Sequence, residues 1–491
     1  MILNVELKGT GSYKNMLFNT LEFGIFFITI YLLYRILAHR WQNILLLIAS
    51  YYFYGCWNWR FLSLIFISTV VDYFCGIKIG EGKDSSKRKL FLIISVITNL
   101  GILGFFKYFN FFSESFINLL STIGLQANAR SLNIILPVGI SFYTFQTMSY
   151  TIDIYRKKME PTYKFLDFAL FVSFFPQLVA GPIERAKNLL PQILNRRTIT
   201  YEKFYEGSFL IFWGLFKKIF IADNLAKIVD TIFATSDVQN GLIVMLGVLA
   251  FAFQIYGDFS GYSDIARGLS KVMGFELMVN FNLPYFSVNP SDFWRRWHIS
   301  LSSWLKDYLY ISLGGSRNSN IATYRNLMLT MILGGLWHGA GWTFVLWGFY
   351  QGAILVIHRF FQPILKKIFR MKNSILEFVG LWVRIIIMFI FANIGWLIFR
   401  AQSIEQIKNM VYSILFNISL TPLIEIEKLA VEIAFYTVPL VLIQLVQFKK
   451  NDLLVLYKSK VYIKSLVYLA LILLFLITGV QGGRTFIYFQ F

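Results

Sequence analysis

Apolar stretches recur from residue 21 almost to the end of this chain, and they constrain its fold more than any other feature. Lipid offers no partner for an open backbone hydrogen bond, and the stretches are too long for barrel strands, so each crossing is predicted to be a helix. A perpendicular span requires about 20 residues, and some stretches are shorter, so we expect about ten to twelve true crossings. The stretches cover residues 21–38, 42–55, 61–77, 90–106, 132–155, 165–180, 208–221, 241–256, 324–339, 342–361, 378–399, 426–446 and 462–480.

The composition supports an all-α, polytopic membrane protein. Apolar residues make up 57% of the chain and charged residues 15%, whereas an average soluble chain is about 45–50% apolar and about 25% charged. These values exclude a disordered protein, a coiled coil and a conventional water-soluble enzyme. No internal repeat and no Pro/Gly-rich linker is visible, so we predict a single integral membrane domain over residues 1–491.

The net charge of +20 comes from 46 Lys and Arg against 26 Asp and Glu. Basic residues cluster in short loops at 81–89, 366–372 and 449–464, as is typical of loops held on the cytoplasmic side. A nucleic-acid partner is therefore not expected. Cys56 and Cys75 form no C-x-x-C pair and predict neither a disulfide framework nor a zinc site. The stretch at 21–38 is expected to be a retained span, because no small-residue cleavage site follows it.

The segment from 257 to 325 is too polar and irregular for lipid, yet it is rich in Trp, Tyr, Gly and Arg. Polar backbone at membrane depth is tolerated only where protein buries it or water lines it. We therefore predict a partly re-entrant element that lines a cavity inside the bundle, and we look for the chemistry there.

His338 is the strongest candidate for a chemical role. It lies in GGLWHGAGW (334–342), at the end of one apolar stretch and almost touching the next. An ionisable residue within membrane-spanning sequence is costly and is a functional candidate. The flanking glycines allow a substrate or a neighbouring helix to approach the imidazole closely. The alternative is a histidine that only makes a hydrogen bond between two helices.

His298 lies in FWRRWHIS (293–300), directly after two arginines. Two neighbouring positive charges disfavour a third, so this imidazole is expected to be neutral and able to accept a proton. The same cluster is also typical of an amphipathic interfacial helix with tryptophan anchors. His39 and His358 each precede an arginine at the end of an apolar stretch and are interpreted as interfacial caps.

The common catalytic motifs are absent. The chain has no G-x-S-x-G elbow, no Walker loop, no H-E-x-x-H and no His/carboxylate cluster at metal-ligand spacing. What remains is an intramembrane base, arginines suited to phosphate and an aromatic, glycine-lined cavity. This combination suits direct transfer of a group from a phosphate-bearing donor to an acceptor hydroxyl.

Several ordered motifs resemble the membrane-bound O-acyltransferase family, in its bacterial branch of alginate and peptidoglycan O-acetyltransferase membrane subunits. The resemblance covers nearly the whole chain. It is carried by WRRWHISLS (294–302), GGLWHG (334–339), LPVGISFY (136–143), AGPIER (180–185), DFSGYSD (258–264), DYLYISLGG (307–315) and the terminal YFQF (488–491).

The resemblance implies about eleven spans with re-entrant and amphipathic helices around a central tunnel, and a catalytic core at about residues 130–360. The family's invariant histidine maps onto His338 as general base, and its second histidine maps onto His298, for donor placement or proton relay. The protein is then expected in the bacterial inner (cytoplasmic) membrane, among membrane lipids. Acetyl-CoA would be the acyl donor, with no permanently bound cofactor and no metal.

The expected acceptor is an extracytoplasmic polysaccharide, such as alginate, peptidoglycan or another exopolysaccharide, or a hydroxyl of an extracytoplasmic acetyltransferase partner protein. Candidates for the coenzyme's phosphates are Arg295, Arg296, Lys306 and Arg317, since guanidinium groups match phosphate oxygens in two-point contacts; interfacial positive charge is the alternative for each. Candidates for shaping the tunnel or supporting a histidine are Asp258, Ser260, Tyr262, Asp264, Trp297 and Trp337.

Two other functions remain open on the sequence alone. Within the same superfamily, the chain could be a D-alanyl transferase that acts on teichoic acid through a carrier protein. In a different class, it could be a transporter or channel whose polar middle segment lines a permeation path. The absence of a visible inverted repeat counts against the second alternative.

Overall fold

The computed structural model describes residues 16–125, 132–178, 181–368, 374–479 and 484–487, and the following statements concern these residues. They are helical, with no strand among them, as the sequence predicted. The α-helices are α1 Leu21–Ile36, α2 His39–Asn58, α3 Leu62–Glu81, α4 Ser85–Leu103, α5 Phe109–Thr122, α6 Ile140–Tyr155, α7 Phe165–Ser173, α8 Phe175–Leu178, α9 Ala186–Leu194, α10 Tyr201–Leu215, α11 Asp223–Ile232, α12 Gly241–Val272, α13 Pro290–Arg296, α14 Ile299–Trp304, α15 Asn320–His338, α16 Trp342–Ile368, α17 Ser374–Arg400, α18 Ile404–Phe416, α19 Leu423–Lys450 and α20 Val461–Thr478. Short 3₁₀ turns cover Trp59–Phe61 (η1) and Pro284–Phe286 (η4), and π-helical segments cover Gly104–Tyr108 (η2), Phe216–Ala222 (η3) and Leu305–Tyr310 (η5).

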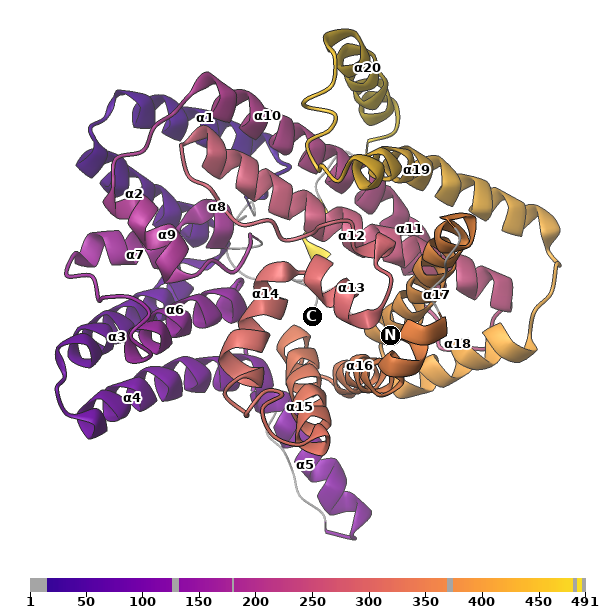
Figure 1. Ribbon diagram of the computed structural model, residues 1–491, viewed down its shortest axis with the longest axis horizontal. Helices are drawn as coiled ribbons and strands as arrows, with labels where there is room; N and C mark the ends of the chain where they lie inside the picture. The colour runs from indigo at the N-terminus through magenta and orange to yellow at the C-terminus, as the bar shows by residue number, and fades with distance from the viewer. Residues whose placement is uncertain (1–15, 126–131, 179–180, 369–373, 480–483, 488–491) are drawn as a thin grey trace.

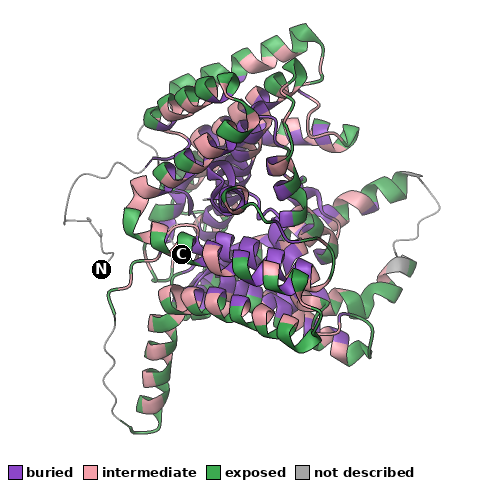
Figure 2. Ribbon diagram, turned by 90° about the vertical axis from the view of Figure 1, so that its left-hand side faces the viewer, coloured by how far each residue is buried: buried purple, intermediate pink, exposed green. Residues whose placement is uncertain are grey.

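Helix α12 runs through the middle of the molecule (Figure 1). Its 32 residues span about 48 Å at 1.5 Å per residue, which exceeds a hydrocarbon core of about 30 Å. It packs most closely against α10, and it also contacts η3, α11, α17, α18 and α19. Buried residues concentrate along the centre of the molecule (Figure 2), and the larger hydrophobic cluster includes residues from Met16 to Ile487.

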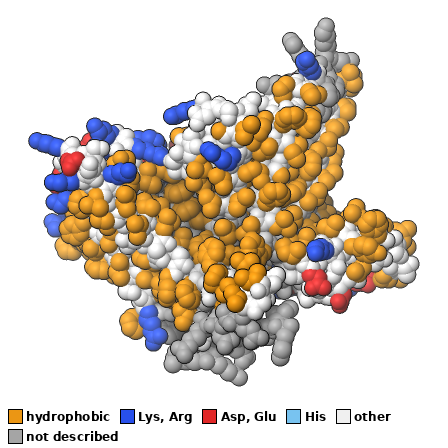
Figure 3. Space-filling model, turned by 90° about the horizontal axis from the view of Figure 1, so that it is seen from below, with side chains coloured by type: hydrophobic (Ala, Val, Ile, Leu, Met, Phe, Trp, Pro, Cys, Tyr) orange, Lys and Arg blue, Asp and Glu red, His pale blue; other side chains and the backbone are white. Residues whose placement is uncertain are grey.

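Seven helical segments are long and apolar enough to cross a membrane, by length and composition. Hydrophobic side chains cover much of the face in Figure 3, while Lys and Arg gather mainly at its left end. These features agree with a multi-pass membrane protein. The sequence count of about eleven included shorter apolar helices, such as α1 and α6 with 16 residues each, so that count stays a prediction.

The polar middle segment differs from its prediction in one respect. Residues 257–272 are not irregular but form the second half of α12, in which small residues let α10 approach. At Gly261 an added Cβ would lie 2.8 Å from Gly214 O, a backbone atom of α10. The irregular part begins after Val272 and carries the short helices α13 and α14. The polar residues of 257–272 thus face protein neighbours and do not interrupt the helix. The sequence pattern alone does not distinguish these two arrangements.

Helices α15 and α16 form a close pair that carries His338 at its end. At Gly335 an added Cβ would lie 2.2 Å from Phe344 O and 3.0 Å from Gly348 Cα. Both are backbone atoms of α16, so only glycine allows this separation.

We predict that Gly335→Ala forces α15 and α16 apart and destabilises the protein by about 1–3 kcal/mol, the usual cost of overpacking. Thermal unfolding of the detergent-solubilised protein measures this as a lower midpoint. Gly101→Ala on α4 is the matched control, because nothing lies within 4 Å of its added Cβ. Equal midpoints for the two variants would contradict the close crossing.

Candidate active site

His338 is the last residue of α15 and is buried, with 3% of its surface exposed. Aromatic rings surround its imidazole: the Trp347 ring centroid lies 5.0 Å away, that of Trp337 5.1 Å and that of Phe399 5.5 Å. The chain leaves the helix at Gly339, where an added Cβ would collide with the Phe344 ring at 2.1 Å. The glycines that flank His338 in the sequence therefore serve close packing around the imidazole.

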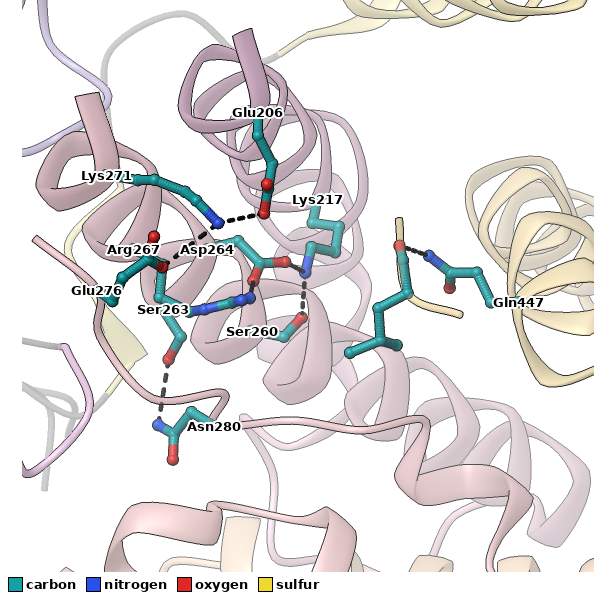
Figure 4. Close-up of polar contacts among 11 residues, drawn as sticks. Glu206, Lys217, Ser260, Ser263, Asp264, Arg267, Lys271, Glu276, Asn280 and Gln447 are labelled. Carbon is teal, nitrogen blue, oxygen red and sulfur yellow. Dashed lines mark hydrogen bonds and ion pairs between the residues drawn. The ribbon is translucent and has the colours of Figure 1, made fainter. Parts of the chain in front are cut away.

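His298 lies between α13 and α14 and is fully buried. Its backbone is in the left-handed region at φ 42°, a conformation that costs a non-glycine residue about 1–3 kcal/mol and recurs at functional sites. Asn280 holds this turn, because its carbonyl accepts from Ile299 N at 2.9 Å and its Oδ1 accepts from Ser300 N at 3.1 Å. Asn280 also donates to Ser263 Oγ of α12 at 3.2 Å (Figure 4). No sequence motif pointed to Asn280.

Burial lowers the pKa of His298 to about 3, so this imidazole is uncharged at neutral pH. The sequence argument also expected a neutral ring, but it assigned the effect to the preceding arginines. In the structure Arg295 is exposed and Arg296 pairs with Asp292 at 2.9 Å. The physical cause is therefore the loss of solvent rather than repulsion between neighbouring charges.

The two histidines form a pair deep in the protein, with ring centroids 6.3 Å apart. Phe259 lies 4.5 Å from the His298 ring, and Trp337 lies 5.8 Å from it. Residues from α12, the α13–α14 turn and the end of α15 thus meet at one point, although they are far apart in sequence. This is the convergence of His298 and His338 that a common catalytic role requires.

A small cavity of about 70 Å³, here called the histidine cavity, opens beside His338. It is lined by Lys107, residues 136–142, Trp337 and His338. Residues 136–142 belong to the LPVGISFY motif and lead into α6, after Gly139 in the left-handed region at φ 74°. A buried imidazole with an adjoining cavity can act on a small group that enters the cavity.

A larger, separate cavity of about 570 Å³, here called the basic cavity, lies near His298. Its charged lining residues are Lys217, Asp264, Arg267, Arg296 and Asp452. Phe281 and Ile299 also line it; the Phe281 ring lies 6.4 Å from that of His298, and Ile299 is the next residue in the chain. One layer of side chains therefore separates this cavity from His298.

The cations of the basic cavity are organised by Asp264 of α12 (Figure 4). Lys217 Nζ lies 2.6 Å from one carboxylate oxygen, and Arg267 lies 3.0 Å from the other. Lys217 also donates to Ser260 Oγ at 3.0 Å. Arg267 therefore lines the basic cavity while its guanidinium is paired with Asp264.

The four phosphate candidates from the sequence do not converge. Arg296 lines the basic cavity, whereas Arg295, Lys306 and Arg317 are exposed. Sequence reasoning missed Lys217 and Arg267, because neither belongs to the motif that contains the histidines. Lys217 is buried, with 2% of its side chain exposed.

The other supporting candidates lie in the core around α12. Asp258 binds Lys218 Nζ at 2.8 Å and accepts from Ile487 N at 2.6 Å. Lys218 is buried and also binds Asp223 at 2.7 Å. Tyr262 is buried beside Lys218, and Trp297 and Trp337 are buried near His298. The terminal YFQF motif lies outside the described residues.

Several known proteins are similar to this chain in sequence. The probable alginate O-acetylase AlgI of Pseudomonas aeruginosa is 45% identical over 415 residues, which are 84% of this chain and 77% of that protein. The peptidoglycan O-acetyltransferase of Helicobacter pylori is 39% identical over 423 residues, 80% of this chain and 78% of that protein. The teichoic acid D-alanyltransferase of Bacillus subtilis is 30% identical over 252 residues, 48% of this chain and 62% of that protein.

Residues 157–399 match the MBOAT, membrane-bound O-acyltransferase family. This range contains both buried histidines and most of the basic cavity. Similarity of this extent, running through both histidine segments, shows that the chain belongs to the membrane-bound O-acyltransferase family and is an O-acyltransferase.

Proposed function

We propose that this protein takes an acetyl group from acetyl-CoA on the cytoplasmic side of a bacterial inner membrane and delivers it to a hydroxyl on the other side. The observation that supports the proposal is that the histidine pair lies near two separate cavities. His338 lines the histidine cavity, and His298 lies one side-chain layer from the basic cavity. A donor and an acceptor can therefore approach the pair from different directions.

The basic loops support this assignment of sides. The basic cavity includes residues 451–454, which lie within the basic stretch 449–464 that the charge pattern assigns to the cytoplasm. The histidine cavity includes Lys107, at the far end of α4 from the basic loop 81–89. The 19 residues of α4 span about 28 Å, close to the thickness of a bilayer core. These features support the proposal that the two cavities open toward opposite sides of the membrane.

The reaction would proceed by direct transfer. A ring nitrogen of His338 takes the proton from the acceptor hydroxyl while that oxygen attacks the carbonyl carbon of the thioester. A C–O bond forms and the C–S bond breaks, and the leaving thiolate takes the proton from the imidazolium to give the free thiol. Base assistance of this kind contributes about 10²–10⁴ in rate. His298 would support donor placement or relay the proton.

The expected acceptor is a hydroxyl of an extracytoplasmic polysaccharide, or of a partner acetyltransferase that passes the acetyl group on. The relatives named for alginate and peptidoglycan O-acetylation support this class. The teichoic acid D-alanyltransferase matches a shorter part of the chain at lower identity, so carrier-borne D-alanine is the second donor to test. All three relatives named above are acyl-transferring enzymes, which counts against the alternative that this chain is a transporter or channel.

We predict that His338→Ala lowers the cleavage of acetyl-CoA thioester by about 10²–10⁴-fold, because the acceptor loses its base. The measurement is release of free thiol by the purified protein in lipid, with a hydroxyl acceptor present. His358→Ala is the matched control, because His358 lies on α16 outside both cavities. Wild-type turnover by His338→Ala would reject the proposed role, and turnover only with a D-alanyl carrier would replace acetyl-CoA as the donor.

We predict that Arg296→Gln raises the KM for acetyl-CoA by about tenfold with little change in kcat, since a charged hydrogen bond to a phosphate contributes about 1.5–3 kcal/mol. Arg295→Gln should change the KM by less than about twofold, because Arg295 is exposed outside the basic cavity. Steady-state kinetics at fixed salt separates the two variants. Equal effects would show that the basic cavity does not hold the donor.

A further inference from the structure

The C-terminal end of α15 is held by two side chains from a different part of the chain. A helix leaves its last four carbonyls without intrahelical partners, and in α15 these belong to residues 335–338, the last of which is His338. Gly335 O accepts from Gly339 N at 3.4 Å. Leu336 O accepts from Tyr108 Oη at 2.7 Å.

Lys107 binds the two remaining carbonyls at the end of α15. Its Nζ donates to Trp337 O at 2.7 Å and to His338 O at 3.0 Å, and it lies 3.5 Å from Ser141 Oγ. A lysine side chain at a helix C-terminus also interacts favourably with the negative end of the helix dipole. Every carbonyl of the last turn is thus bound, and two of the four bonds come from Lys107.

The local geometry explains how successive residues reach the same helix end. Lys107 and Tyr108 are the last two residues of η2, a π-helical segment between α4 and α5. A π-turn is wider than an α-turn, so neighbouring side chains point in more similar directions, and such segments are frequent at functional sites.

Lys107 also borders the space where the acceptor would lie. It lines the histidine cavity together with Ser141 and His338. It also lines a neighbouring cavity of about 350 Å³ with Asn110, Ala340 and Phe344. A lysine inside a membrane-spanning segment is costly, and a role as a helix cap alone would not require it to border these cavities.

We propose that Lys107 is a positioning residue for His338: by binding the carbonyls of Trp337 and His338, it fixes the imidazole at the edge of the histidine cavity. This inference rests on the proposed role of His338 as the base. Misplacement of a catalytic group by about 1 Å costs roughly 10²-fold in rate, so a loosened helix end would lower kcat while the distant donor cavity stays intact.

The test compares kcat and KM for acetyl-CoA in variants of Lys107. Lys107→Met, which removes both donors, should lower kcat by about 10–100-fold without changing the KM. Lys107→Arg, which can still donate to both carbonyls, should recover most of the rate. Lys89→Met on the exposed surface of α4 is the matched control and should behave as the wild type.

A purely structural cap would give a different pattern. Lys107→Met would then lower the yield and melting temperature, while the remaining folded protein would keep its wild-type kcat, and that result overturns the inference. If Lys107→Met does not accumulate, Lys107→Gln decides, because its amide can still bind one carbonyl: an intermediate kcat supports the inference, and a wild-type kcat overturns it. Activity in His338→Ala would instead refute the proposed function, so the two failures are distinguishable.

Discussion

Two lysines buried in the middle of the bundle must be paired with carboxylates, and the arrangement of the central segments depends on that pairing. Lys217 binds Asp264, and Lys218 binds both Asp223 and Asp258. Removing one partner from a buried ion pair costs about 3–5 kcal/mol, because the remaining charge has no solvent. These contacts join η3 and α11 to α12, and the Asp258 carboxylate also holds Ile487 near the end of the chain.

This polar centre makes room for chemistry within a hydrophobic protein. On one side of α12, Asp264 keeps Lys217 and Arg267 at the basic cavity. The turn at His298 and the end of α15 bring the two imidazole rings together, with their centroids 6.3 Å apart. Burial excludes water, which strengthens electrostatic interactions and limits hydrolysis of a reactive acyl group. The same packing that stabilises the bundle therefore also isolates the site.

The sequence predicted the helical class and the multi-pass character, because these depend on hydropathy, and its short motifs singled out the two histidines that the structure places side by side. It did not predict that residues 257–272 continue α12, because polar residues buried against protein resemble a broken span. It also missed the buried position of Lys217 and Lys218 and the binding of Lys107 and Tyr108 to the end of α15. Both pairs of residues, 217–218 and 107–108, lie in π-helical segments. The geometry of such segments depends on tertiary contacts rather than on hydrophobic periodicity, so the sequence pattern does not reveal it.

The central claim is that a thioester from the basic cavity meets the imidazole of His338. The most direct measurement is a structure of the protein in lipid with a non-hydrolysable acetyl-CoA analogue. The account predicts that the coenzyme's phosphates lie in the basic cavity and that the acyl carbonyl lies within about 6 Å of the His338 ring, which leaves room for one acceptor oxygen between them. An analogue bound elsewhere, or one whose acyl group points away from His338, would contradict it.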